Sequence, residues 1–580
     1  MTGPANSRDT VALTAPGPDA PSPGIAVTVS AEAVAWFVVI ALAAVLRFAA
    51  LDRLPFTLGE AERALEAVRV ADGSAPLGWS GDLAAALTAH LFRLSGEGEL
   101  AARAAPAVAG TLLVAALLLA RPLIGRLGAL VAAALVAASP LFILVSRSAL
   151  PFSAGALVAA VMVVSLFLYL RQPAPLPAFL FAVAFALAPL TDAVAVSAAV
   201  AVVAYLALEG VLFRGRAVRD AVRAFVRSPS HWPPAVIVLA AAVQLGLTHF
   251  GTTTAGPGLP GLEQWLDMFD WPRDGREPEY QALLLFAYDW PLLLAGCAGL
   301  VWLAACCVGA GLRGVSPFQR FLLLWLGSAA AMTALAAQRE AGQLLMLLLP
   351  LSLLAGTWAE DALSALGWSV LRRWWPLVAG PLALIAYAAL VLTRWSAPGD
   401  VEWGERAGLV LALGAAAAVL AGAHALMSRR AWPLVLTVSG FVVAAFLAHS
   451  SLAVSLEDGV EPAADERLQP RAEQFAQTLE MLGLERGGDI VVDEALAGPL
   501  AWPLRDSTAV FRPGAEGASA FVTFADRSPA GFSPLGGTWR LVEGWYPRDI
   551  DPLLLWRWLV YRRPYGNLHS IEVRIFVPTL

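Results

Sequence analysis

The chain has 580 residues, of which 58% are hydrophobic and only 14% are charged. About a quarter of a soluble globular protein is charged, so the composition excludes that class and indicates a polytopic membrane protein. The net charge of −6 gives no support for nucleic-acid binding, and all 39 basic residues are arginine.

The three cysteines do not form a recognisable site. Cys297, Cys306 and Cys307 all fall inside apolar runs. Neither a disulfide framework nor a zinc site is supported by that placement. We therefore expect them to be small residues of the core.

The N-terminal part of the chain combines a tail with a first membrane helix. Residues 1–30 are rich in Pro, Gly, Ala, Ser and Thr without periodicity, which predicts a disordered cytoplasmic tail. The apolar run 31–50 is longer than the core of a signal peptide and long enough to span a bilayer. We therefore expect an uncleaved first helix.

A long loop, 52–102, follows the first helix and contains two amphipathic segments, at about 57–70 and 82–94. Thr57 and Glu60 have the spacing of a capping box, so a helix is predicted to begin here and to end near Arg69, with Gly73 beyond it. Segments of this kind usually lie on the membrane surface.

The acidic residues of this loop have two interpretations. Unpaired acids beside a bilayer are costly and often functional. The alternative for Glu60 is a cap on its own helix, and for Glu62 and Glu66 it is a solvated face paired with Arg63 and Arg69. The residues alone leave both interpretations open.

Further apolar runs predict about thirteen membrane helices in all. They lie at 103–121, 127–146, 152–170, 174–190, 193–212, 233–250, 288–310, 318–337, 341–358, 374–393, 406–427 and 432–450. Arginine-rich loops, such as the one holding Arg219 and Arg223, all fall on one side of this arrangement. The positive-inside rule then makes the N-terminus cytoplasmic and the loops 52–102 and 251–287 external.

The composition changes after residue 450 to a charged, water-compatible one. The segment RAEQFAQTLEMLGLE has an amphipathic helical pattern, GGDIVVDEA reads as a short buried strand, and TWRLVEGW and SIEVRIFV read as alternating strands. The fold class is thus an all-α polytopic membrane domain over 31–450 with a small α/β extracytoplasmic domain over 451–580. We expect the protein to be in the plasma membrane.

Several motifs resemble the C-type membrane glycosyltransferases, and family 39 in particular, which includes protein O-mannosyltransferases. Members show an Asp-Glu-Ala-like motif that opens the first external loop, an Arg at the next helix and a later Ser-Pro…Ser-Arg stretch. The matching residues here are Gly59-Glu60-Ala61, Arg103, Ser139-Pro140 and Ser146-Arg147. The chain also resembles a narrower group of flippase activity-associated membrane proteins, through Trp265, Arg276, Pro278, Tyr280 and Tyr288-Asp289.

The resemblance implies transfer of a sugar from a polyprenyl-phosphate donor to a protein, glycan or lipid acceptor on the outer face, with inversion. Such a reaction needs a carboxylate that deprotonates the acceptor hydroxyl and a cation for the departing phosphate. With no lysine in the chain, arginine must supply that cation. A divalent cation such as Mg²⁺ or Mn²⁺ stays open as a helper, although no ligand cluster supports one.

These requirements assign candidate residues. We expect Glu60 and Asp82 to be catalytic, with Glu60 as base and Asp82 as helper acid or metal ligand. The predicted substrate-binding residues are Arg103, Arg147, Arg276, Tyr280 and Glu62. For the arginines, snorkelling at the interface is the alternative. Asp192 and Asp289 are further acids near outer helix ends, where capping is the alternative.

Two departures from the family pattern leave rival functions open. Gly59 stands where relatives keep the first acid, and Gly81-Asp82-Leu83 stands where the narrower group has a His-Gly-Pro-like turn. The first rival is therefore a non-catalytic relative that binds lipid-linked sugars or helps translocate them. The second is a transporter, for which inverted repeats and broken helices carrying acids at mid-membrane would be expected. It ranks last, because the interiors of the predicted helices are almost uniformly Ala, Leu and Val.

Overall fold

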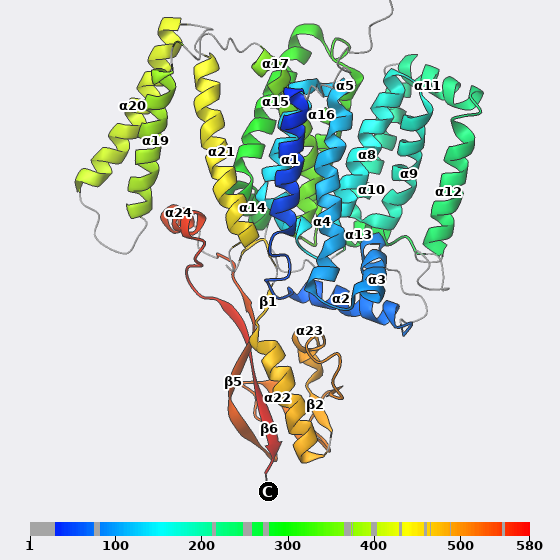
Figure 1. Cartoon of the computed structure of the whole chain (residues 1–580), viewed down its shortest axis with the longest axis vertical. Helices are drawn as coiled ribbons and strands as arrows, with labels where there is room; N and C mark the ends of the chain where they lie inside the picture. The colour runs from blue at the N-terminus through cyan, green and yellow to red at the C-terminus, as the bar shows by residue number, and fades with distance from the viewer. Residues whose placement is uncertain are drawn as a thin grey trace, which may run out of the picture.

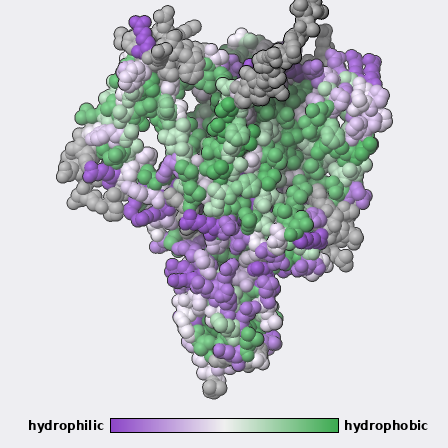
Figure 2. All heavy atoms as spheres, in the orientation of Figure 1, coloured by the Kyte–Doolittle hydropathy of each residue, from purple (hydrophilic) through white to green (hydrophobic). Residues whose placement is uncertain are grey.

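The computed structural model describes residues 30–74, 82–211, 216–247, 258–270, 278–364, 373, 375–395, 403–427, 432–456, 461–464, 466–487, 489–547 and 551–579. The predicted disordered tail lies outside this part of the chain, apart from Ser30. Figure 1 shows long helices side by side, with a smaller sheet domain at one end. Figure 2 shows an apolar surface over the helices and a more polar surface where the small domain begins. The chain is a multi-pass membrane protein with a second, water-compatible domain.

Among the described residues, nine helices are long and apolar enough to cross a membrane, and a bent helix pair raises that number to ten. The nine spans are α1 (Ala31–Phe48), α4 (Glu99–Ala116) with η1 (Leu117–Ala120) and α5 (Arg121–Ile124), α8 (Phe152–Arg171), α10 (Ala193–Val211), α15 (Trp290–Ala310), α16 (Pro317–Leu335), η3 (Ala341–Leu344) with α17 (Leu345–Ser364), α19 (Pro376–Trp395) and α21 (Trp432–Leu456). The remaining three predicted runs fall on α9 (Pro175–Thr191), α12 (Trp232–Leu247) and α20 (Trp403–Met427), whose described apolar stretches are shorter.

The run predicted to span at 127–146 is bent, because it consists of α6 (Arg126–Ala138) and α7 (Pro140–Ser146), which meet at 61°. Pro140 has no N–H to continue the helix and disfavours helical backbone at Ser139, whose φ and ψ are −64° and 122°. Helix breaks at membrane depth must have their polar groups satisfied by protein. Arg47 donates to the carbonyls of Val136 and Ala137.

The two ends of the membrane domain differ in what they carry. Figure 1 shows α2 (Leu58–Ala71), α3 (Leu83–Ser95), α13 (Pro260–Asp267) and the sheet domain at one end, and the arginine-rich α11 (Arg216–Arg227) at the other. The segments predicted to share the external side therefore do lie at one end. Which end faces the cytoplasm stays a prediction.

The first helix of the long loop begins as predicted. Thr57 is the N-cap of α2, both hydrogen bonds of its capping box with Glu60 are present, and Gly73 follows the helix with φ +75°. The buried face of α2, including Ala64, packs on protein and belongs to one hydrophobic cluster with Phe92 of α3 and Phe475 of the C-terminal domain. The position of this helix on the membrane surface stays a prediction.

The C-terminal domain is built on one six-stranded mixed sheet in the order β1-β5-β6-β4-β2-β3. Only β2 pairs in parallel, with β3 and β4, and the other pairs are antiparallel. Its elements are β1 (Arg467–Leu468), α22 (Arg471–Arg486), β2 (Ile490–Val492), η5 (Glu494–Leu496), α23 (Ala497–Leu500), β3 (Val510–Phe511), β4 (Ala520–Phe524), β5 (Phe532–Gly544), α24 (Pro552–Tyr561) and β6 (His569–Pro578). The predicted helix and strands of this domain are all present.

The C-terminal domain is fastened to the membrane domain at several places. Its helix α24 returns to the lower end of α19 (Figure 1), where Trp556 Nε1 donates to Thr393 Oγ1 at 3.3 Å. Buried Glu461 accepts hydrogen bonds from Arg562 and from the hydroxyl of Tyr288, the last residue of α14 (Pro278–Tyr288). The two domains therefore share an interface with polar and aromatic contacts.

The cysteine prediction is only partly right. All three thiols are free, and Cys306 and Cys307 are half-buried against the main apolar cluster. Cys297 is exposed on α15, so it is not a core residue. On a membrane helix a small apolar residue can face the lipid as easily as the protein core. The apolar sequence around Cys297 therefore did not indicate whether it is buried.

Candidate functional site

Glu60 lies in the first turn of α2 and is buried, with 2% of its surface exposed. Its carboxylate accepts a hydrogen bond from the backbone N–H of Thr57 at 2.9 Å and another from that of Ala149 at 2.8 Å. Arg103 donates two more, each at 2.8 Å. These four bonds occupy both oxygens. The geometry therefore supports a structural role for Glu60 and does not support the predicted role as base.

The electrostatics of Glu60 agree with this structural role. Burial alone would raise the pKa of Glu60, but the charge and hydrogen bonds of Arg103, with the N–H groups of Thr57 and Ala149, hold the pKa below its ordinary value. Glu60 therefore stays ionised as one half of a buried ion pair. Such a carboxylate is a weak proton acceptor.

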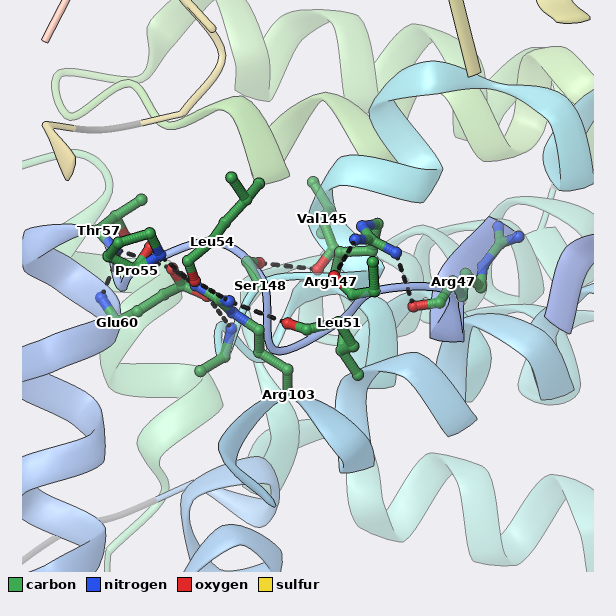
Figure 3. A network of polar contacts seen from close by, with 12 residues as sticks. Arg47, Leu51, Leu54, Pro55, Thr57, Glu60, Arg103, Val145, Arg147 and Ser148 are labelled. Carbon is green, nitrogen blue, oxygen red and sulfur yellow. Dashed lines mark hydrogen bonds and ion pairs between the residues drawn. The ribbon is translucent and has the colours of Figure 1, made fainter. Parts of the chain in front are cut away.

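Arg103, on α4, ties the first loop to the membrane helices. Besides Glu60, it donates to the backbone carbonyls of Leu51, Leu54 and Pro55 at 3.1, 2.6 and 3.2 Å. Figure 3 shows the guanidinium surrounded by these groups. The predicted contact of Arg103 with a phosphate has no support in this arrangement, because Glu60 already neutralises its charge.

Arg147 directly follows α7, and its side chain lies against the C-terminal end of α1. Its guanidinium donates to the carbonyls of Leu46, Arg47, Ala49 and Ala50 at 2.7–3.2 Å, as Figure 3 shows in part. Carbonyl oxygens orient an arginine without cancelling its charge. Burial together with two neighbouring arginines lowers the pKa of Arg147 to about 10. The repulsion from these two arginines favours an anion beside Arg147.

Those two neighbours are Arg103 and Arg467, and all three arginines line one narrow cavity of about 70 Å³. We call it the arginine cavity. It lies at the ends of α1, α7 and α21, where the membrane domain meets the sheet domain. Its lining also includes the carboxylate residues Glu60, Glu340 and Glu461.

A further segment of this site, residues 466–468, comes from the C-terminal domain. Leu468 N donates to the Phe56 carbonyl at 2.9 Å, and Leu58 N donates to the Glu466 carbonyl at 2.8 Å. These bonds hold residues 466–468 beside the start of α2 in the manner of a short antiparallel pair. Arg467 reaches the arginine cavity through this pairing.

A second, wider cavity of about 470 Å³ lies on the other side of α2. We call it the acidic cavity, because its lining includes Glu62, Glu66, Asp82, Glu263, Asp267 and Glu340. Arg63 is the basic residue in that lining. Burial alone would lower the pKa of Arg63, but the carboxylates of Asp82, Glu340 and Glu66 raise it. The cavity is therefore negatively charged around a single firmly protonated arginine.

Asp82 lines the acidic cavity with both oxygens in use. Its Oδ1 accepts from Ala85 N at 2.8 Å as the N-cap of α3, and its Oδ2 pairs with Arg63. Asp82 is thus a helix cap. A catalytic role for Asp82 stays a prediction, and it would require the pair with Arg63 to open.

The other predicted site residues do not lie together. Glu62 lines the acidic cavity. Tyr280 is buried away from both cavities and donates its hydroxyl to the Pro462 carbonyl at 3.2 Å, so it acts as an anchor for the C-terminal domain. The predicted contact of Tyr280 with substrate has no support in that position. Arg276 lies outside the described residues.

The two further acids are helix caps. Asp192 Oδ1 accepts from Ala195 N at 3.0 Å at the start of α10. Asp289 Oδ2 accepts from Leu141 N at 3.2 Å, which satisfies the first turn of α7 at the break after α6. Across the part of the chain that the structure describes, no group of three or more His, Cys, Asp and Glu residues is placed to hold a metal ion. The divalent cation stays a prediction.

Glu340 and Arg467 were not identified from the sequence. Glu340 follows Arg339 directly before the apolar run at 341–358, and a charged pair at the outer end of a predicted span was a usable signal. Arg467 had no such signal, because its place depends on the chain folding back to pair with residues 56–58.

Comparisons with known proteins agree with this architecture. Residues 82–219 match the family model described as dolichyl-phosphate-mannose-protein mannosyltransferase. No curated protein matches the chain. The narrower resemblance to the flippase activity-associated group stays a prediction.

Solved structures are similar over most of the chain. ArnT from Cupriavidus metallidurans bound to undecaprenyl phosphate is 15% identical, with a TM-score of 0.54 over 85% of this chain and 94% of that chain. ArnT in the apo state is 16% identical, with a TM-score of 0.51 over 83% and 86%. The archaeal oligosaccharyltransferase AglB from Archaeoglobus fulgidus gives 13% identity and a TM-score of 0.48 over 85% and 69%. The chain thus has the C-type membrane glycosyltransferase fold, and its residues 82–219 carry the pattern of the protein mannosyltransferase family.

Proposed function

We propose that this protein transfers a sugar from a polyprenyl-phosphate donor to an acceptor hydroxyl, at the end of the membrane domain that carries the sheet domain. The observation that carries the proposal is the convergence of Arg103, Arg147 and Arg467 on one cavity. The fold, the family match and the undecaprenyl phosphate bound to ArnT all support it.

The proposed contacts of the donor phosphate are Arg147 and Arg467. The charge of Arg103 is balanced by Glu60, whereas the described bonds of Arg147 all go to carbonyl oxygens. The planar arginine fork suits two phosphate oxygens at once. A phosphate beside Arg147 would also relieve the repulsion among the three arginines.

The reaction is proposed to take place on the outer face of the plasma membrane. The cavities lie at the end opposite to the arginine-rich α11, and arginine-rich segments favour the cytoplasmic side. The lipid tail of the donor would then lie in the outer leaflet, beside the ends of α7 and α21. The acceptor class, whether protein, glycan or lipid, stays open.

Binding of undecaprenyl phosphate to the purified full-length chain tests the donor site. Native mass spectrometry should show about tenfold weaker binding for Arg467→Gln and for Arg147→Gln, since each loses a charged hydrogen bond. Arg505→Gln is the matched control, because Arg505 of the C-terminal domain forms a partly exposed pair with Glu97 of the first loop, away from the arginine cavity, and its loss should leave binding unchanged. Equal binding of undecaprenyl phosphate to the wild type and all three variants, or no binding to any of them, would refute this donor site.

A second function is a non-catalytic relative that binds lipid-linked sugars or helps to translocate them. Two observations favour it: Gly59 takes the place of an acid, and the neighbouring Glu60 is fully hydrogen-bonded. The two functions differ in turnover. A non-catalytic relative would bind undecaprenyl phosphate without transferring sugar from a panel of undecaprenyl-phosphate sugars to peptide or polysaccharide acceptors.

A further inference from the structure

We propose that Glu340 is the general base that deprotonates the acceptor hydroxyl, an inference that rests on the proposed sugar transfer. Two residues line both the arginine cavity and the acidic cavity, and Glu340 is the titratable one, the other being Leu150. A base for this reaction must lie within hydrogen-bond reach of the acceptor hydroxyl. Glu340 lines the acidic cavity at its border with the arginine cavity, where an acceptor hydroxyl could approach a sugar held by the donor phosphate.

The carboxylates nearest in sequence to the family motif are committed elsewhere. Glu60 accepts four hydrogen bonds and Asp82 uses both oxygens, one as a helix cap and one toward Arg63. Both acids lie on the first loop. The segment before α17 also reaches this place and carries a carboxylate, Glu340, that lines both cavities.

The backbone around Glu340 is held firmly. The N–H groups of Ala337 and Gln338 both donate to the Met268 carbonyl, at 2.8 and 3.2 Å, and Gln343 N donates to the carbonyl of Glu340 itself at 3.2 Å. Two residues after Glu340, Gly342 packs so closely on Phe152 that an added Cβ would stand 2.0 Å from the ring. A catalytic side chain on such a segment is well positioned.

The charges around Glu340 suit a base. Arg63 lies in the acidic cavity and interacts favourably with both Asp82 and Glu340. The attraction is mutual, so Arg63 favours the ionised form of Glu340, while the carboxylates of Glu62, Glu66 and Asp82 in the same lining oppose it and favour uptake of a proton. On the other side, Arg147 faces the position proposed for the phosphate.

The proposed step balances in protons and electrons. The acceptor hydroxyl, held in the acidic cavity, gives its proton to the Glu340 carboxylate as its oxygen forms a bond to the anomeric carbon of the sugar. The bond from that carbon to the phosphate oxygen breaks, and its electron pair leaves with the polyprenyl phosphate. Arg147 and Arg467 stabilise the charge that develops there.

Steady-state kinetics of the full-length chain in lipid nanodiscs test this role, with the undecaprenyl-phosphate sugar and hydroxyl acceptor that the wild type uses. We expect Glu340→Gln to lower kcat about 100-fold or more, while the affinity for undecaprenyl phosphate stays within about twofold of wild type. Retained affinity shows that the variant is folded. Glu97→Gln, on the surface, is the matched control and should retain the wild-type kcat.

The pH profile separates a base from a merely structural residue. In the wild type kcat should fall at acidic pH as the base is protonated, and Glu340→Gln should lose that limb, whereas Glu340→Asp should keep it with reduced kcat. If the wild type transfers sugar and Glu340→Gln keeps more than about a tenth of its kcat, or keeps the acidic limb, Glu340 is not the base. If the wild type neither binds undecaprenyl phosphate nor transfers sugar, the proposed function itself fails.

Discussion

At the scale of single residues, the Glu60 carboxylate has two structural roles. Glu60 caps α2 through Thr57 and also forms a buried ion pair with Arg103, 43 positions later in the chain. A buried charge is tolerated only when it is paired and its remaining lone pairs are satisfied. The Ala149 N–H completes that requirement.

The Glu60–Arg103 pair should make stability depend on acid pH. The fold lowers the pKa of Glu60 below its ordinary value of 4.5, so the stabilisation is fully present above about pH 4.5 and is lost as pH falls through the lowered pKa. We expect Glu60→Gln to lower the thermal unfolding temperature at pH 7, because Arg103 loses a buried partner. Toward pH 3 the difference in unfolding temperature between Glu60→Gln and the wild type should become smaller.

Thermal unfolding in detergent, followed by tryptophan fluorescence, measures this effect across the pH range. Glu97→Gln is the control, since its pair with Arg505 is partly exposed and is worth at most about 1 kcal/mol. A constant gap between Glu60→Gln and wild type from pH 7 to pH 3 would contradict the assignment.

At the scale of elements, the break between α6 and α7 is supported on both of its sides. Arg47 donates hydrogen bonds to two carbonyls at the end of α6, and Asp289 accepts a hydrogen bond from an N–H in the first turn of α7.

Helix α6 also contacts α17, and at this contact the two backbones meet without side chains between them. An added Cβ on Gly128 would stand 2.5 Å from the Gly356 carbonyl oxygen. Small residues permit this close contact of helix backbones.

This contact predicts that Gly128→Ala destabilises the membrane domain. The new methyl group must push α6 from α17, at a cost of about 1–3 kcal/mol. Gly414→Ala on α20 is the matched control, because nothing lies within 4 Å of its added Cβ. Thermal unfolding of both variants in detergent provides the measurement, and an unfolding temperature for Gly128→Ala equal to that of wild type would show that the helices are not in contact here.

At the scale of the whole molecule, the candidate site belongs to neither domain alone. The first loop contributes Glu60 and the segment before α17 contributes Glu340, while the C-terminal domain contributes Arg467. The sheet domain also covers the apolar face of α2. The C-terminal domain is therefore part of the site and not an appendage.

The sidedness of the whole chain can be tested by labelling. In a chain whose native cysteines are replaced by alanine, Thr538→Cys in β5 should react with a membrane-impermeant maleimide on intact cells, because the sheet domain is proposed to be outside. Ser230→Cys, in the turn after α11, is the opposite-side control and should react only after lysis; both positions are exposed. Labelling in the reverse order would overturn the proposed orientation.

The amino-acid sequence by itself determined the membrane class, the positions of the helices and the strands of the C-terminal domain. These follow from local signals, namely apolar runs of bilayer length, the capping box at Thr57 and the alternation in β5 and β6. It also pointed to Glu60 and Asp82, whose residue types and spacing suit an acidic site.

Only the tertiary structure decided what these acids do, because each role depends on partners distant in the sequence. Glu60 accepts hydrogen bonds from Arg103 and Ala149, and Asp82 pairs with Arg63, so each acid is held by a partner that its local sequence does not reveal. Arg467 lies near Arg147 only because the C-terminal domain folds back onto the first loop, and Glu340 reaches the same cavity from the segment before α17. Local patterns carry no information about such long-range pairing, whereas burial and packing determine it.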